Sequence, residues 1–150
     1  MTIVGLGYHG KNDAGEVPQL WGALMARAEE IKDRDFAIRA AYGISIMGPD
    51  YEETMIFDYI AGFPVEGTGE DLPEGMVKYT IPEGQYVEIT CPNLDSIGKA
   101  YDAVYRWTEQ SDEYEIDLTK GNFCFELYGE EFMPDQGSEL FYIYVPVKTK

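Results

Sequence analysis

The stretch GNFCFELYG, residues 121–129, is the most informative part of the chain for its fold. The seven residues between its two glycines predict a β-strand, because they are rich in aromatic side chains and poor in polar ones. Glu126 nevertheless lies in the middle of this run. Successive side chains of a strand point to opposite faces of a sheet, so this acid either faces solvent or is held in a pocket.

The segments on both sides of this strand alternate between helical and extended patterns. Residues 18–32 and 97–108 carry apolar side chains at helical spacing, so each predicts a helix. The loop GFPVEGTGEDLPEG, residues 62–75, is rich in glycine, proline and acids and is the predicted connection between two halves. The other apolar runs predict strands, at residues 3–8, 36–47, 53–61, 76–81, 84–91, 122–128 and 139–147.

The two halves, about residues 1–65 and 75–150, repeat each other. Tyr42-Gly43 aligns without a gap with Tyr128-Gly129, 86 residues later, and the predicted helices correspond at a spacing of 80 residues. The repeat predicts a single α+β domain over residues 1–150, built from duplicated βαββ units with pseudo-twofold symmetry. We expect an antiparallel sheet with the helices on one face and a ligand groove on the other.

The same alignment bears on the acid in the opening stretch. At a spacing of 86 residues the counterpart of Glu126 is Ala40. A residue that the framework needs would tend to recur in both halves. The repeat therefore indicates that the fold does not require an acid at this place.

Composition and charge exclude several classes of protein. The 28 Asp and Glu residues outnumber the 11 Lys and Arg residues and give a net charge of −17, which opposes binding to nucleic acid or to anionic membranes. Such acidity also serves solubility alone. Cys91 and Cys124 lack metal-ligand spacing and His9 is the only histidine, so no metal or cofactor is predicted. Without a signal or membrane-spanning pattern, we expect a cytoplasmic protein with reduced thiols.

Three segments of the second half carry a resemblance to a known family. They are IPEGQYVEITCPN at 81–93, IGKAYDAVYRWTEQSDEYE at 97–115 and FELYGEEFMPDQGSELFYIYVPVK at 125–148. In this order they resemble the GyrI-like domain, also called the AraC-type effector-binding domain, and residues 3–21 resemble its free-standing bacterial members. One departure is that such members commonly begin with a further strand before the segment that starts here at Ile3. Many relatives also carry a helix-turn-helix region, for which this sequence has no room, so we expect no direct DNA binding.

The resemblance implies both the fold inferred from the repeat and a function. Its members bind small aromatic, often cationic molecules in a groove between the halves, and the acid that contacts the ligand's charge matches Glu126. We therefore expect a multidrug-type binding module that acts as a sensor in transcription regulation or sequesters its ligand. The partner is then a small aromatic or cationic ligand. A protein partner or a homodimer is left open.

Strand alternation suggests which side chains would form the site. Phe123, Phe125 and Leu127 would face the helices, whereas Cys124, Glu126 and Tyr128 would face the groove. On the last strand, Phe141, Ile143 and Val145 suit the core. The candidate ligand-binding residues are Glu126, Tyr128, Tyr142, Tyr144, Trp21, Tyr86 and Tyr42. For Tyr142, Tyr144 and Trp21, ordinary packing is an equally good interpretation.

Two alternatives remain at this level. Some GyrI-like proteins hydrolyse strained, cyclopropane-bearing natural products, which implies that Glu126 could act as a catalytic general base toward water, with a tyrosine hydroxyl as donor to the oxyanion. Other members inhibit DNA gyrase through protein contacts. We rank this last, because the sequence shows no focused acidic run outside its loops.

Overall fold

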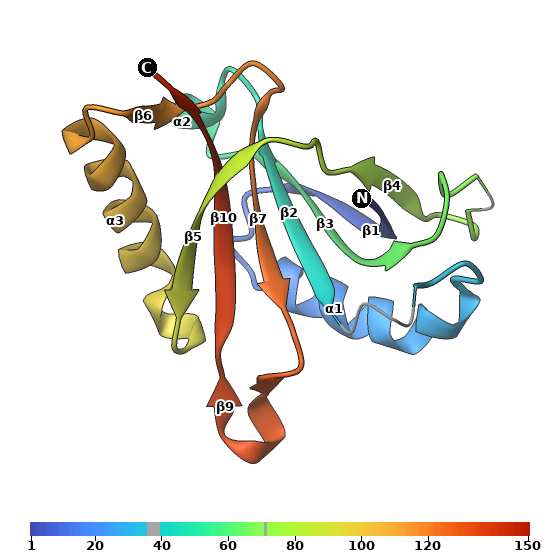
Figure 1. The fold of residues 1–150 in the computed structure, drawn as a ribbon. Coiled ribbons are helices and arrows are strands. Elements are labelled where there is room, and N and C mark those ends of the chain that lie inside the picture. Colours follow the sequence, from blue (N-terminus) through green and yellow to red (C-terminus); the bar gives the residue numbers. More distant parts are fainter. Residues whose placement is uncertain (36–39, 71) are drawn as a thin grey trace.

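The computed structural model describes residues 1–35, 40–70 and 72–150 and has the predicted α+β class (Figure 1). Its helices are α1 (Glu16–Arg27), α2 (Tyr51–Thr54) and α3 (Ile97–Gln110), with short 3-10 turns at Ala28–Glu30, Leu94–Ser96 and Pro134–Gln136. Its strands are β1 (Thr2–Gly10), β2 (Ala41–Met47), β3 (Phe57–Val65), β4 (Val77–Thr80), β5 (Gln85–Cys91), β6 (Tyr114–Ile116), β7 (Asn122–Tyr128), β8 (Phe132–Met133), β9 (Ser138–Glu139) and β10 (Phe141–Thr149).

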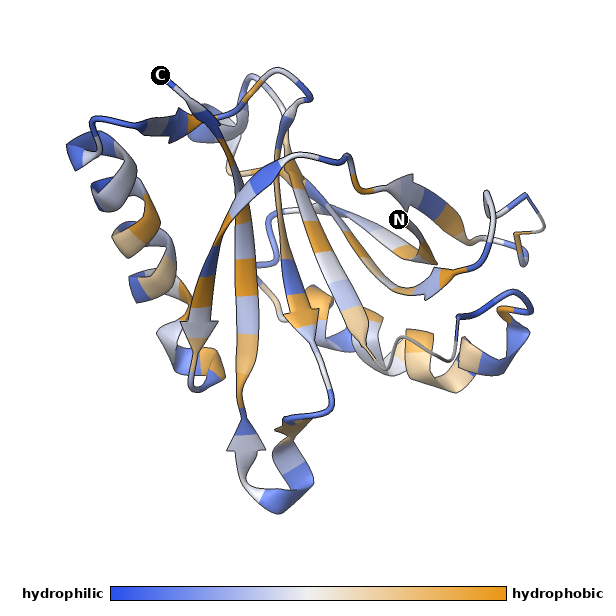
Figure 2. Ribbon diagram, in the orientation of Figure 1, coloured by the Kyte–Doolittle hydropathy of each residue, from blue (hydrophilic) through white to orange (hydrophobic). Residues whose placement is uncertain are grey.

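One large antiparallel sheet holds the molecule together, in the order β4-β1-β3-β2-β7-β10-β5, with β6 paired to β10. Its halves, β1-β3-β2 and β7-β10-β5, meet where β2 pairs with β7. The short β8–β9 hairpin projects from one end of the sheet (Figure 1). Figure 2 shows hydrophobic residues along the central strands and hydrophilic residues in most connecting loops. No helix in the described ranges is long and apolar enough to cross a membrane.

The register between β2 and β7 locates the pseudo-twofold axis and corrects the sequence alignment. Ile44 pairs with Phe125 at the middle of both strands, so residues of β2 correspond to residues of β7 at a spacing of 81, not 86. The counterpart of Glu126 is therefore Ser45 rather than Ala40. The connection from β7 to β10 is three residues longer than that from β2 to β3, so β3 and β10 correspond at a spacing of 84 and no single spacing aligns both pairs of strands.

Helices α1 and α3 pack on the same face of the sheet. Helix α1 buries Leu24 against Val4 and Phe63 of β1 and β3, and α3 buries Ala100 and Val104 against β5, β7 and β10. As expected, Phe141, Ile143 and Val145 of β10 belong to the α3 core. These two cores hold the helices apart along the sheet.

The opposite face is a closed core, and this overturns the expected position of the groove. Strands β4 and β5 lie at opposite edges of the sheet but are joined by residues 81–84 alone, so the sheet must curl until its edges approach. Phe123 and Phe125 face this core with Ile44 and Ile81, and not the helices as alternation on β7 had suggested.

Several element boundaries differ from the sequence predictions. Helix α1 ends at Arg27, before the predicted limit of 32, and β3 continues to Val65 into the predicted linker. Residues 51–54, in part predicted as strand, form the short α2, which ends where Met55 takes a φ of 61°. Of the strand predicted over 36–47, residues 36–39 lie outside the described ranges.

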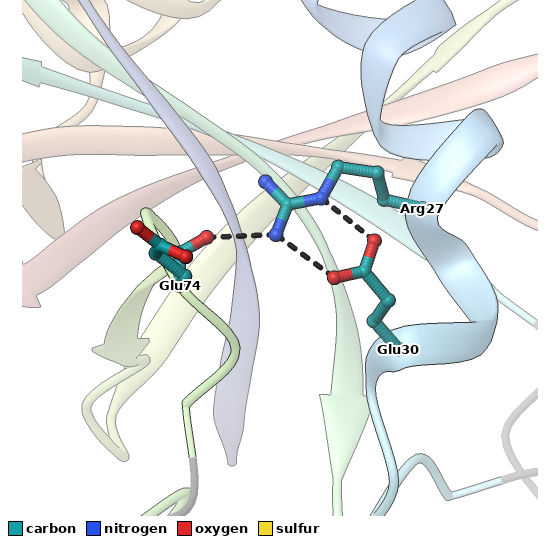
Figure 3. Close-up of polar contacts among 3 residues, drawn as sticks. All are labelled: Arg27, Glu30 and Glu74. Atoms are coloured by element: carbon teal, nitrogen blue, oxygen red, sulfur yellow. Dashed lines mark hydrogen bonds and ion pairs between the residues drawn. The ribbon is translucent and has the colours of Figure 1, made fainter.

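The end of α1 is tied to the segment that leads into β4. Arg27 Nε donates to Glu30 Oε2 at 2.8 Å, and Arg27 Nη2 donates to Glu30 Oε1 at 3.0 Å and to the backbone oxygen of Glu74 at 2.7 Å (Figure 3). These bonds link the C-terminal turn of α1 to the segment before β4, at the edge of the sheet.

Candidate functional site

A cleft of about 960 Å³ lies between α1 and α3, on the helical face of the sheet. Its floor is the junction of β2 and β7, where both halves of the molecule meet. The lining comprises Ala41, Ser45, Met47, Cys124, Glu126 and Tyr128 of the floor, Val17, Pro18, Trp21, Met25, Ile97, Tyr101 and Tyr105 of the helices, and Asn12, Tyr51, Phe57, Tyr59, Leu94, Gly129 and Phe132 around them.

The cleft runs parallel to β2 and has two distinct ends. At about 3.4 Å per residue, the floor from Ala41 to Met47 is about 20 Å long. We call the end beside Met47 the Phe57 end, because Met47 pairs with Phe57. We call the end beside Ala41 the Phe132 end, because Ala41 pairs with Tyr128, whose ring packs on Phe132.

Glu126 lies on the floor and is buried, with 8% of its surface exposed. Two hydroxyl groups donate to its Oε1 atom, from Tyr59 at 2.9 Å and from Tyr128 at 2.8 Å. No fully buried side-chain nitrogen or oxygen lacks a partner among the described residues. Oε2 receives neither of these two bonds, so it is not fully buried. Because Glu126 lines the cleft, we infer that Oε2 is accessible from the cleft.

The hydroxyl of Tyr59 connects this carboxylate to the wall formed by α1. Trp21 Nε1 donates to the Tyr59 hydroxyl at 3.1 Å, and the Trp21 ring meets the Tyr128 ring edge-on at 5.4 Å. Tyr59 comes from β3, which pairs with β2, so it must reach across β2 to meet Glu126 on β7. The acid, two tyrosines and one tryptophan therefore form one hydrogen-bonded and packed group.

Gly43 leaves the room for this contact. It pairs with Glu126 across the β2–β7 junction. A Cβ atom on Gly43 would lie 2.0 Å from the Tyr59 hydroxyl oxygen and 2.9 Å from Glu126 Oε1. Any side chain at this position would displace the hydroxyl, so the missing Cβ lets Tyr59 cross the strand.

Burial dominates the ionisation of this group. Loss of water raises the pKa of Glu126, while the hydrogen bonds from Tyr128 and Tyr59 oppose the rise by favouring the charged form. Burial, and next the charge of Glu126, raise the pKa values of Tyr128 and Tyr59. Both tyrosines thus stay protonated as donors, and the acid pays a desolvation cost that a bound cation would offset.

A second pair lies beside Glu126 on the α3 side. The Tyr101 hydroxyl and Cys124 Sγ are 3.3 Å apart, and burial raises the pKa of Cys124 to about 12. The thiol is therefore a neutral, unreactive part of the floor. Glu126 is the one acid among the described residues that line the cleft, and that lining holds no lysine, arginine or histidine.

The structure brings together some of the residues predicted to form the site and separates others. Glu126, Tyr128 and Trp21 line the cleft. Tyr42, Tyr86 and Tyr144 pack in the closed core on the other face, where Tyr144 also bonds the exposed Glu88. Tyr142 pairs with Leu127, so it shares that face.

Sequence reasoning missed Tyr59 and Tyr101. Tyr101 carried a signal, because the helix repeat at a spacing of 80 residues places it opposite Trp21. Tyr59 carried none, since its role depends on the register of β3 and on the space above Gly43. Pairing of strands and not any local pattern brings it to the acid.

Comparison with known proteins gives relatives and neighbours of the same fold. The transcriptional regulator BrlR of Pseudomonas aeruginosa is 28% identical over 148 residues, and the match covers 97% of this chain and 52% of that protein. The chain therefore spans about half the length of this curated relative.

Two solved structures share the fold at low sequence identity. The integron cassette protein VCH_CASS2, from the mobile metagenome of Vibrio cholerae, superposes with a TM-score of 0.59 at 17% identity, covering 99% of this chain and 90% of that one. The protein SAV2435, solved with tetraphenylphosphonium bound, superposes with a TM-score of 0.63 at 15% identity, covering 99% and 88%. The model of the Cass2 family, described as integron-associated effector binding protein, matches residues 1–147, so the chain belongs to this GyrI-like family.

Proposed function

We propose that the protein binds lipophilic organic cations that carry aromatic rings, in the cleft between α1 and α3. The observation that carries this proposal is the buried Glu126 on the floor of an aromatic cleft that holds no basic side chain among its described lining. Such a carboxylate has no counter-charge among the described residues that line the cleft. A ligand cation would supply it.

The charge of Glu126 favours a cationic ligand. A carboxylate taken out of water loses hydration, and the hydroxyls of Tyr59 and Tyr128 replace only part of it at Oε1. Oε2 is left for the ligand. In a partly dehydrated cleft an opposite charge is attracted more strongly than in water, because the effective dielectric constant is lower.

The walls of the cleft favour a ligand with aromatic rings. Trp21 and Tyr128 lie beside the acid on one side and Tyr101 on the other. Aromatic faces attract cations by about 0.5–2 kcal/mol each and offer flat apolar area to the ligand's rings. Delocalised cations such as phosphonium dyes suit these walls better than a small, strongly hydrated ammonium ion.

The comparisons support the same class of ligand. The family is described as effector-binding, and the neighbour SAV2435 was solved with tetraphenylphosphonium. We propose that the chain acts as a drug-responsive sensor or sequestering module in the cytoplasm. A part in transcription regulation is proposed from BrlR alone, of which the chain matches about half.

The test uses Trp21 as a reporter inside the cleft. Trp107 is 43% exposed and stacks on Tyr114 outside the cleft lining, so Trp107→Phe leaves Trp21 as the single tryptophan signal. In this background we expect tetraphenylphosphonium to quench the fluorescence saturably. Glu126→Gln should weaken binding about 10- to 100-fold, because the cation loses its partly buried partner.

Two controls isolate the charge. Tetraphenylborate has nearly the shape of tetraphenylphosphonium with the opposite sign, so it should bind poorly to the wild type and gain relative affinity in Glu126→Gln. Glu88→Gln removes an exposed acid from β5 on the other face and should leave both affinities unchanged. Equal binding of the two ions, or equal affinities of wild type and Glu126→Gln, would refute the proposal.

The hydrolase alternative uses the same carboxylate and receives less support. The hydroxyls of Tyr59 and Tyr128 already donate to Oε1, so neither is available to stabilise an oxyanion without moving. The Tyr101 hydroxyl, which lies 3.3 Å from Cys124 Sγ, is the other nearby donor. Turnover of a cyclopropane-bearing electrophile, lost in Glu126→Gln while binding persists, would favour hydrolysis over simple binding.

A further inference from the structure

The position of Glu126 along the cleft is not central. On the floor, side chains that face the cleft occur in cross-strand rows, and Glu126 shares its row with Gly43. One row separates it from Ala41 at the Phe132 end, or about 7 Å, whereas two rows, or about 14 Å, separate it from Met47 at the Phe57 end. The longer part of the cleft therefore runs from the acid toward the Phe57 end.

The two ends also differ in how they close. At the Phe132 end, the Tyr128 ring stacks on Phe141 at 5.1 Å and meets Phe132 edge-on at 4.8 Å, which fills the space beside the acid with packed rings. At the Phe57 end, Tyr51 packs edge-on against Phe57 at 6.3 Å. Facing them from α3 is Tyr105, which is 47% exposed. This end is aromatic and open.

The Phe57 end offers no second charge. Ser45, the pseudo-twofold counterpart of Glu126, supplies a neutral hydroxyl in the next row. None of the described residues that line the cleft beyond it is ionised at neutral pH, so a second cationic centre placed there would find no charged partner in this lining. The volume of about 960 Å³ lies near the upper limit for small-molecule sites, which are about 300–1,000 Å³.

We infer that the ligand is an elongated monocation, with its charge beside Glu126 and a neutral aromatic arm that extends to Tyr51 and Tyr105 at the Phe57 end. This inference rests on the proposed function and adds the ligand's length, its single charge and its direction in the cleft. The ring of the arm lies over Ser45 and Cys124. A compact cation occupies only the acid's own part of the cleft.

The test compares two probes with the same cationic centre. Tetraphenylphosphonium is compact, and biphenyl-4-ylmethyl triphenylphosphonium adds a rigid arm. We expect the longer probe to bind about tenfold more tightly to the wild type, because the arm buries additional apolar surface. Tyr105→Ala should remove most of this gain and change the affinity for tetraphenylphosphonium by less than about twofold.

Met25→Ala is the matched control. Met25 also lines the cleft from a helix and is 55% exposed, but it lies on α1 one turn after Trp21, whose ring contacts Tyr128 at the Phe132 end. Alanine favours helix at both positions, so neither change should disturb the fold. Met25→Ala should change the affinities for the two probes by the same factor.

The outcomes separate this inference from the proposed function. If tetraphenylphosphonium binds in a manner that depends on Glu126, yet the longer probe binds no more tightly or Tyr105→Ala weakens both probes equally, the inference is wrong and the proposed function stands. If neither probe binds, or neither depends on Glu126, the proposed function fails and the inference with it.

Discussion

The two halves of the molecule contribute the same framework to the cleft but different chemistry. Around the pseudo-twofold axis, Trp21 of α1 corresponds to Tyr101 of α3, and both rings form walls. On the floor, however, Ser45 corresponds to Glu126. The symmetric parts form the cavity, whereas the asymmetric parts determine where its charge lies.

The asymmetry extends to each group that contacts the acid. At the spacing of 81 residues, Gly43 corresponds to Cys124 and Tyr128 to Met47, and the strand registers make Ile143 the counterpart of Tyr59. Met47 and Ile143 have no hydroxyl to donate, and Cys124 has the side chain that Gly43 lacks. The groups that contact Glu126 are therefore absent around Ser45. A duplicated fold can acquire a single charged site in this way, because these four positions differ between the halves while the antiparallel pairing of their strands is the same.

The largest expected effect comes from giving Gly43 a side chain, as its counterpart has. Gly43→Ala places a Cβ against the Tyr59 hydroxyl, so the hydrogen bond to Glu126 breaks or the strands shift. We expect the free energy of unfolding in urea to fall by about 2–4 kcal/mol. Gly22→Ala in α1 is the control: a Cβ there meets nothing within 4 Å, so it should stabilise by about 0.5–1 kcal/mol. An unchanged stability of Gly43→Ala would contradict the Tyr59 contact.

The second effect concerns the tyrosine that crosses from one half to the other. Tyr59→Phe removes a donor from Glu126 and the acceptor of Trp21 Nε1, and should cost about 1–3 kcal/mol in urea unfolding. Tyr128→Phe removes a single hydrogen bond and should cost about 0.5–1.5 kcal/mol. The order of the two variants is the critical result. A larger loss in Tyr128→Phe would mean that Tyr59 does not link the halves.

The third effect restores the missing symmetry. Ser45→Glu places an acid at the counterpart of Glu126, so the cleft should accept a ligand with two cationic centres. We expect the affinity ratio of a bis(triphenylphosphonium) probe to tetraphenylphosphonium to rise about tenfold, measured by calorimetric titration. Ser45→Gln adds similar bulk without charge and should leave the ratio unchanged. Equal ratios in both variants would show that Ser45 does not lie beside the bound ligand.

We expect the smallest effect from pH, because the two tyrosine bonds oppose the influence of burial on Glu126. Burial raises the folded-state pKa of this acid above its unfolded value. Its protonated form is then favoured by folding, so this contribution is present below the unfolded pKa and is lost as pH rises through the folded pKa. As pH rises across that window, the wild type should lose stability relative to Glu126→Gln. Thermal unfolding of both proteins at a series of pH values measures this difference. A constant difference between the two proteins would contradict the raised pKa.

The two faces of the sheet mark the limit of sequence reasoning. The pattern of residues 122–128 predicted β7 with its observed bounds, and alternation correctly put Cys124, Glu126 and Tyr128 on one face. Alternation does not say which face the helices cover. The assignment of Phe123 and Phe125 to the helices was therefore wrong, and with it the expected place of Tyr42, Tyr86 and Tyr144 beside the acid.

The sequence by itself determined the α+β class, the duplication, the strand that holds Glu126 and the presence of that acid in one half only. These features depend on local periodicity and on comparison of the chain with itself. Only the tertiary structure decided the face of the cleft, the counterpart Ser45 and the contact with Tyr59. They depend on strand register, on connections of unequal length and on the curl imposed by residues 81–84, all of which join residues far apart in the chain.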